Sequence, residues 1–170
     1  MARGPSRSRP VRAVGLNHVS VGATDLETSA RFYEGLFGME RLPTPTFSIP
    51  VVWLRLGDLQ LHLFEDRSGT APRFHHFGLE VDDFEAFYVR VRELGIRDPA
   101  WASFIYELPG GEVQMYLRDP AGNLVEIDWP DASTLDRSVV TDLRKLSDDV
   151  VQAPGSELAS LFTGARIEAG

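Results

Sequence analysis

The 170-residue chain contains no cysteine and a single lysine, Lys145. The absence of cysteine excludes disulfides, thiolate nucleophiles, thiolate zinc sites and cysteine-ligated iron–sulfur clusters. With one lysine, any Schiff-base chemistry would depend on Lys145 alone. No apolar run approaches the ~18–20 residues that a transmembrane helix needs, so we expect no membrane partner.

Positive charge is scarce in most of this chain, whose net charge is −8. Residues 1–13 hold four arginines and no acidic residue, interspersed with glycine, proline and serine, which predicts a flexible basic arm. This arm lacks the apolar stretch of a secretory signal, so we expect a cytoplasmic protein. The remaining chain is acidic, which argues against nucleic acid as a partner because phosphate binding depends on Lys and Arg.

Two segments of the chain share one pattern of predicted elements. Each begins with a strand-like stretch that opens at a histidine, His18 or His76, and continues into an apolar periodicity typical of a helix. Each helical pattern ends at a glycine, as a left-handed C-cap favours: Gly38 in the first segment and Gly95 in the second. The capping-box spacing at the other end predicts N-caps for the two helices at Thr24 and Asp82.

Strand-like runs follow each helix and are separated by turn residues. In the first segment, Gly57-Asp58 is a hairpin signal between runs at 51–56 and 59–64. In the second, the Gly110-Gly111 turn and a tight turn at 119–123 separate runs at 104–108, 113–117 and 124–129. A sheet of about four strands cannot bury both faces alone. We therefore predict an α+β fold in which two βαβββ modules, residues 14–66 and 74–130, pair around a shared concave interior.

Residues 131–170 form a separate C-terminal segment. The spacing of Leu135, Val139, Leu143 and Leu146 predicts one amphipathic helix. We expect this helical tail to pack on the outside of the sheet or across a dimer interface. Paired modules leave sheet edges and apolar surface to protect, so a homodimer is predicted as well.

The candidate metal ligands come from matching places in the repeat. His18 and His76 open the two segments, whereas His62 and Glu126 lie in their last strands. If the modules pair about a pseudo-twofold axis, these four side chains converge in one cavity. Imidazole and carboxylate suit Zn²⁺, Ni²⁺, Co²⁺, Mn²⁺ or Fe²⁺. Gln60 lies on the same strand face as His62 by period-2 alternation and is the alternative ligand there.

Several motifs together resemble the vicinal oxygen chelate superfamily, which includes glyoxalase I, methylmalonyl-CoA epimerase, extradiol dioxygenases, fosfomycin-resistance enzymes and bleomycin-binding proteins. The resemblance covers about residues 14–130 and implies paired modules with a metal at the centre of a U-shaped sheet. By position, the implied ligands are His18, His62, His76 and Glu126. Glutamate or glutamine is commoner than histidine at the place of His62. The motifs that carry the resemblance are Asn17-His18-Val19-Ser20-Val21, Leu61-His62-Leu63-Phe64-Glu65, His75-His76-Phe77-Gly78-Leu79-Glu80-Val81-Asp82-Asp83 and Arg118-Asp119-Pro120-Ala121-Gly122-Asn123-Leu124-Val125-Glu126.

Further residues are expected to bind substrate. The resemblance implies that Tyr116, ten residues before Glu126, faces the metal and contacts the substrate as a hydrogen-bond donor or acid. The alternative is that Tyr116 is an ordinary strand aromatic. Gln114 shares its face, Ser20 is expected to line the cavity, and Gln60 is also expected to bind substrate. Glu126 would serve as a base only if it left the ion.

Two function classes follow from this resemblance. The first is a divalent-metal-dependent enzyme, an isomerase, lyase or dioxygenase, that acts on a small oxygen-bearing substrate through a stabilised oxyanion or enolate. The second is a metal-free protein that sequesters a small molecule, as bleomycin-resistance proteins do. Binding-only members generally lose the ligand set, and its presence here favours the enzyme. The scarcity of basic residues disfavours a large polyanionic substrate.

Overall fold

The computed structural model describes residues 13, 15–68, 71, 73–98, 104–161 and 163. Of the predicted basic arm, residues 1–13, all but Ala13 lie outside the described residues. Within the described part of the chain, no helix is both long and apolar enough to cross a membrane.

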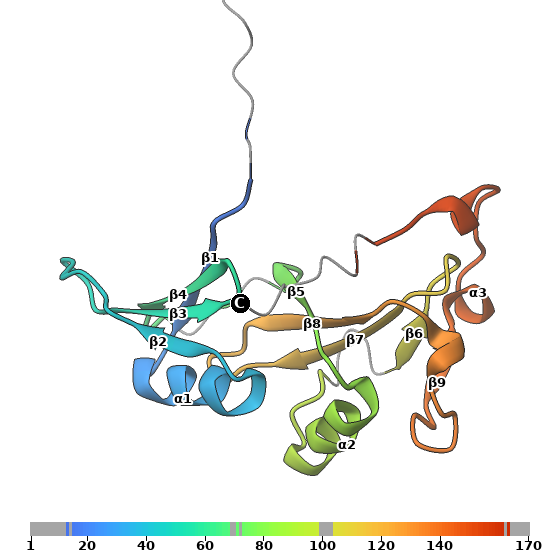
Figure 1. Ribbon diagram of the computed structural model, residues 1–170, viewed down its shortest axis with the longest axis horizontal. Coiled ribbons are helices and arrows are strands. Elements are labelled where there is room, and N and C mark those ends of the chain that lie inside the picture. The colour runs from blue at the N-terminus through green and yellow to red at the C-terminus, as the bar shows by residue number, and fades with distance from the viewer. Residues whose placement is uncertain are drawn as a thin grey trace, which may run out of the picture.

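The first module is a four-stranded sheet with one helix on one side (Figure 1). Its strands follow the order β1-β4-β3-β2. The β1–β4 pair is parallel, and the other two pairs are antiparallel. The Gly57-Asp58 turn joins β3 to β4, as predicted. The elements in chain order are β1 (His18–Ala23), α1 (Leu26–Phe37), β2 (Glu40–Leu42), β3 (Val51–Leu56) and β4 (Leu59–Glu65).

The second module repeats this arrangement and confirms the predicted pair of βαβββ units. Its sheet has the order β5-β8-β7-β6, extended at the β6 edge by a fifth strand, β9 (Leu143–Lys145). The β5–β8 pair is again parallel, in the same place as β1–β4. The module consists of β5 (His76–Glu80), α2 (Phe84–Leu94), β6 (Ile105–Glu107), β7 (Val113–Arg118) and β8 (Leu124–Trp129).

The two long helices have equivalent caps. Gly38 and Gly95 are the C-caps, with φ values of 64° and 65° in the left-handed region, as predicted. The N-caps, however, are Asp25 and Asp83, one residue later than predicted. These aspartates have extended backbone, and their carboxylates accept hydrogen bonds from backbone N–H groups three residues on. A carboxylate at a helix N-terminus is also favoured by the helix dipole.

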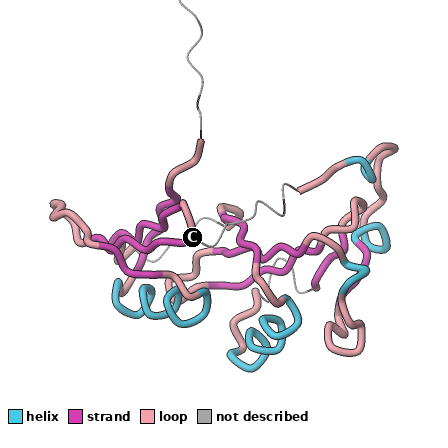
Figure 2. The backbone as a smooth tube through the Cα atoms, in the orientation of Figure 1, coloured by secondary structure: helices cyan, strands magenta, loops and turns pink. Residues whose placement is uncertain are grey.

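The core lies between the sheets and the helices, which cover the same side of both sheets (Figure 2). Alternate residues of the strands, such as Leu61 and Leu63 in β4 and Val125 and Ile127 in β8, are buried on that side. One continuous apolar cluster extends through both modules. The opposite side of the sheets holds the predicted site residues, which the same alternation directs away from the core.

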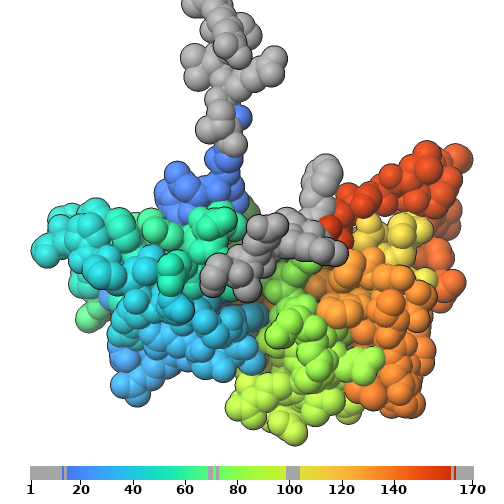
Figure 3. All heavy atoms as spheres, viewed as in Figure 1, coloured from blue at the N-terminus to red at the C-terminus, as the bar shows by residue number. Residues whose placement is uncertain are grey.

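The two modules adjoin (Figure 3), and a buried polar contact joins them. The buried Asp119 carboxylate accepts hydrogen bonds from the Tyr33 hydroxyl of α1 and from the Asn123 side-chain amide, each at 2.8 Å. The same amide donates to the Gly22 carbonyl at the end of β1, at 2.7 Å. The Asp119–Asn123 turn therefore does more than join β7 to β8, because it binds the first module.

The predicted C-terminal helix is wrong. The segment instead forms η1 (Ala132–Thr134), the strand β9, the single-turn helix α3 (Leu146–Asp149) and η2 (Ser156–Leu158). Strand β6 has only three residues. Strand β9 pairs with it in parallel and so covers a sheet edge that would otherwise be exposed. Leu135 is buried at the end of η1 and Leu143 at the start of β9, so their four-residue spacing with Val139 does not reflect a helix.

Candidate functional site

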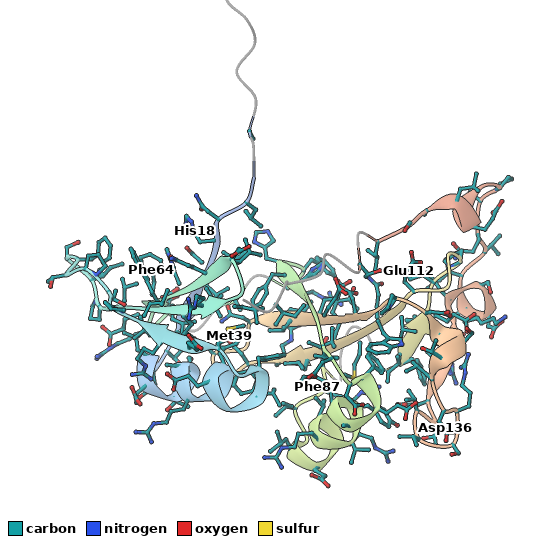
Figure 4. The ribbon with its side chains drawn as sticks, viewed as in Figure 1. His18, Met39, Phe64, Phe87, Glu112 and Asp136 are labelled. Atoms are coloured by element: carbon teal, nitrogen blue, oxygen red, sulfur yellow. The ribbon has the colours of Figure 1, made fainter. Side chains whose placement is uncertain are left out.

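The first half of the candidate site is a stack of three rings on the side of the first sheet away from α1. His18 of β1 stacks on His62 of β4, with ring centroids 4.4 Å apart. Trp53 of β3 stacks on His62 as well. The centroids of these two rings are 4.5 Å apart, and the rings are nearly parallel. His18 and Phe64, which share this side, project away from α1 (Figure 4). The sequence predicted both histidines but not Trp53.

Both histidines have a hydrogen bond that orients the ring. His18 Nδ1 lies 2.5 Å from Asn17 Oδ1, and His62 Nε2 lies 2.8 Å from Gln60 Oε1. Because an amide oxygen only accepts, each contacting nitrogen is assigned the proton, which leaves the other ring nitrogen with its lone pair. Burial, and to a smaller extent neighbouring His18, lowers the pKa of His62. A neutral imidazole is the form that ligates metals.

The second half of the site is a histidine–carboxylate pair. His76 Nε2 lies 2.8 Å from Glu126 Oε2, and His76 Nδ1 lies 2.8 Å from the Phe74 carbonyl, to which it donates. A backbone carbonyl on the distal nitrogen is how metal-ligating histidines are commonly oriented. Glu126 is only 4% exposed, although it lies in the middle of β8 on the side away from α2.

Neutral donors surround the Glu126 carboxylate. Gln114 of β7 donates to Glu126 Oε1. The ring of Tyr116 meets that of His76 edge-on, with centroids 5.7 Å apart. Burial, and then the hydrogen bond and negative charge of Glu126, raise the pKa of Tyr116 well above its usual value. The phenol therefore stays protonated at neutral pH and acts as a hydrogen-bond donor.

Asp128 is a residue of this site that sequence reasoning missed. Burial raises the pKa of Asp128 to about 8, and the nearby Glu126 carboxylate adds to this shift. Its Oδ1 atom is buried and has no hydrogen-bond partner among the described residues. A Cβ at Gly78 would lie 2.7 Å from Asp128 Oδ2, so this glycine leaves room for the carboxyl over β5. Period-2 alternation could have found Asp128, since it lies two residues after Glu126.

The predicted ligands thus lie in two pairs, one in each module. Among the described residues, no group of three or more His, Asp and Glu side chains is close enough to hold a metal ion. Two cavities where the modules meet bring further predicted residues together. One is lined by Gln60 and His76, and the other by Ser20 and His76. Convergence of all four ligands on one ion stays a prediction.

Known proteins share both sequence and fold with this chain. Residues 15–127 match the family model described as Glyoxalase/Bleomycin resistance protein/Dioxygenase superfamily. The mitochondrial methylmalonyl-CoA epimerase of Mus musculus is 28% identical over 136 residues, which cover 71% of this chain and 76% of that relative.

Solved structures agree with this match. The lactoylglutathione lyase of Agrobacterium tumefaciens is 25% identical with a TM-score of 0.52, over 68% of this chain and 93% of that one. A structure titled "Oxidase ChaP-H2" is 28% identical with a TM-score of 0.55, over 71% of this chain and 99% of that one. The predicted resemblance is therefore confirmed, and the chain belongs to the Glyoxalase/Bleomycin resistance protein/Dioxygenase superfamily.

Proposed function

We propose that this protein is a divalent-metal-dependent enzyme that acts on a small oxygen-bearing substrate. The metal ligands in this proposal are His18, His62, His76 and Glu126. Membership of a superfamily with many enzymes supports the general class. The choice of ligands rests on one structural relationship between the modules.

That relationship is the common register of the two parallel strand pairs. Opposite His62 in β4 is Ser20, two residues after His18 in β1. Opposite Glu126 in β8 is Gly78, which likewise stands two residues after the histidine that opens β5. Each module therefore presents one first-strand histidine and one last-strand donor at the same offset, on the side away from its helix. Symmetry of this kind supports one shared site.

The donor set fits a borderline divalent ion such as Zn²⁺, Ni²⁺, Co²⁺, Mn²⁺ or Fe²⁺. His18, His62 and His76 each contact a side-chain or backbone oxygen through one ring nitrogen, as metal-ligating histidines commonly do. Glu126 is a buried carboxylate whose described neighbours include the neutral donors Gln114 and Tyr116. A buried carboxylate of this kind is costly without a cation or a charge-assisted partner.

A bound divalent ion would polarise an oxygen of the substrate and favour the negative charge that develops there. The residues of the chain have separate tasks. Gln114 holds the Glu126 carboxylate in place, and Gln60 holds the His62 ring. Tyr116, protonated and buried beside His76, is placed to donate a hydrogen bond or a proton to a substrate oxygen.

Isomerisation is the reaction type that we favour, because methylmalonyl-CoA epimerases are among the relatives. One carboxyl group suited to proton transfer lies on the site side of β8 at Asp128, two residues after the proposed ligand Glu126, and its pKa is raised to about 8, chiefly by burial. A dioxygenase is the second candidate, supported by the 28% identity to the oxidase ChaP-H2. A two-histidine, one-carboxylate subset of the donors would suit Fe²⁺ for that chemistry. A homodimer and a cytoplasmic location also stay predictions.

The test is metal analysis of protein purified without added metal. We expect about one divalent ion per chain in the wild type and none after the double substitution His18→Ala and His76→Ala. His75→Ala is the matched control, because His75 is exposed and precedes β5. Full metal content in the double variant would reject the proposed site. A folded wild type that binds none of the five metals would favour a metal-free binding protein instead.

A further inference from the structure

A cavity of about 360 Å³ lies where the two modules meet. Its walls include Leu16, Val19 and Leu61 from the first module and Phe77 and Leu79 from the second. The volume lies at the lower end of the range for small-molecule pockets, about 300–1,000 Å³. We call it the seam cavity, because it separates β1 and β5, which are edge strands of their own sheets and are not paired with each other.

The seam cavity passes from the site side of the sheets toward the core. Val19, Leu61 and Phe77 belong to the alternation that faces the helices and pack against the core. Gln60 and His76 belong to the opposite alternation, which carries the predicted ligands. The lining therefore changes from polar, at the candidate metal site, to apolar within the seam.

Charged side chains are missing from this lining: among the described residues around the cavity there is no Asp, Glu, Lys or Arg. The site side of the second sheet is different, since Glu126 and Asp128 lie there. A polyanionic group would meet carboxyl groups on one side and no cationic partner in the seam. An apolar group would lose water and find only hydrocarbon and aromatic surface.

We propose, on the basis of the proposed function, that the seam cavity holds the uncharged alkyl or aryl part of the substrate. The oxygen-bearing end of the same molecule then lies at Gln60 and at His76, which is one of the proposed metal ligands. This assigns the substrate to small carbonyl or hydroxyl compounds with an apolar side chain, and it disfavours large polyanionic thioesters. Leu16 and Leu59, which are 67% and 41% exposed, form apolar rims to the cavity.

The first arm of the test needs no metal. The metal-free full chain is titrated with straight-chain 1-alkanols from propanol to octanol, and the methyl resonances of Val19, Leu61 and Leu79 are followed by NMR. Each methylene buried in the seam is expected to raise the affinity about fourfold, until the cavity is full. Affinity that does not depend on chain length in the wild type would overturn the proposal.

Two pairs of variants locate the binding. Val19→Phe should narrow the seam and remove the dependence on chain length, whereas Val52→Phe, on the same core side of the first sheet but outside the seam lining, should keep it. Leu59→Ala should weaken binding of the longest alcohols severalfold, and Leu94→Ala, equally exposed on α2, should not. The leucine pair keeps the test decisive if Val19→Phe fails to fold. Equal slopes in wild type and both seam variants would reject the seam as the binding site.

The second arm separates this proposal from the proposed function. Zn²⁺-loaded protein is titrated with alkanohydroxamic acids from acetyl to octanoyl, whose paired oxygens bind metal. We expect the same fourfold step per methylene, added to a constant affinity of the head group. Metal binding without a chain-length effect would overturn the seam proposal and leave the proposed function standing. If affinity for alcohols depends on chain length but the protein binds no metal, the proposed function is rejected and binding of apolar groups in the seam cavity stands. Seam resonances that shift with protein concentration would show that a second copy occupies the cavity, which also rejects the proposal.

Discussion

His62 and Glu126 are equivalent residues of the two modules. Each stands in the last strand of its module, opposite the residue two places after the first-strand histidine. Gln60, the alternative ligand considered for the first module, pairs with His18 itself and is therefore equivalent to Leu124, a buried apolar residue. The register thus supports His62 as the ligand and gives Gln60 the task of orienting it.

Substitution at these two positions should separate the roles. We expect His62→Ala to reduce metal affinity by more than two orders of magnitude, because a first-sphere donor is lost. Gln60→Ala should reduce it by about 10–100-fold, the usual effect of losing an orienting hydrogen bond. Competition with a chromophoric chelator measures both constants. If Gln60→Ala proves more damaging than His62→Ala, the assignment of the ligand is reversed.

The contact between the modules should be important for stability. Asp119→Ala removes the acceptor of the Tyr33 hydroxyl and the Asn123 amide, both buried, and breaks the turn that places Asn123. We expect the free energy of unfolding to fall by about 2–4 kcal/mol. Tyr33→Phe, which removes only one hydroxyl, should cost about 1–2 kcal/mol. Chemical denaturation measures both, with the exposed Asp148→Ala as a control that we expect to change stability by less than about 0.5 kcal/mol. Equal stability of Asp119→Ala and the control would contradict this role.

Much of this structure follows from the repeated sequence. Strands at 51–56 and 124–129 and both helix C-caps are predictable, because alternation and glycine positions are local signals. Trp53 was not predictable as a neighbour of His62, since that contact depends on the register of β3 against β4. The prediction of an amphipathic helix in the C-terminal segment was wrong for a related reason. The backbone pairing of Leu143 with Ile105 is a long-range contact that no local period reports.

Acid should loosen the C-terminal segment in a way that depends on Asp142. This carboxylate accepts hydrogen bonds from Tyr88 and Arg97 and so joins the segment to α2 and the following loop. Burial alone would raise the pKa of Asp142. The hydrogen bonds from Arg97 and Tyr88 together outweigh this effect, so the pKa of Asp142 is lowered. Because the folded state then binds this proton more weakly than the unfolded state, the stabilisation is present above the ordinary carboxyl pKa and is lost as pH falls through the lowered value.

The variant Asp142→Asn tests this linkage. Between pH 5 and 7, its free energy of unfolding should lie below that of the wild type by a constant amount. Below about pH 4 the difference should shrink, because the wild type also loses the charge. Denaturation at several pH values measures the difference. A gap between the two proteins that does not narrow in acid would show that Asp142 stabilises the segment without its charge.

Tyr116→Phe should distinguish metal chemistry from simple binding. The substitution removes one hydroxyl and little volume, and the phenol is not among the proposed ligands, so metal content should stay the same. Tyr116 is protonated throughout the neutral range, and burial and then the neighbouring Glu126 raise its pKa further. Turnover should therefore fall by about 10²–10⁴-fold if the phenol is a general acid, and by less if it only positions the substrate. Steady-state kinetics on a substrate accepted from a panel of diketone–thiol adducts, catechols, epoxides and acyl thioesters provides the measurement.

Leu124 precedes Glu126 in β8 and is buried beside Tyr116, so Leu124→Val controls for a general disturbance of packing. Wild-type turnover in Tyr116→Phe would show that this tyrosine only lines the pocket. The fold and the assignment of the metal ligands would still stand.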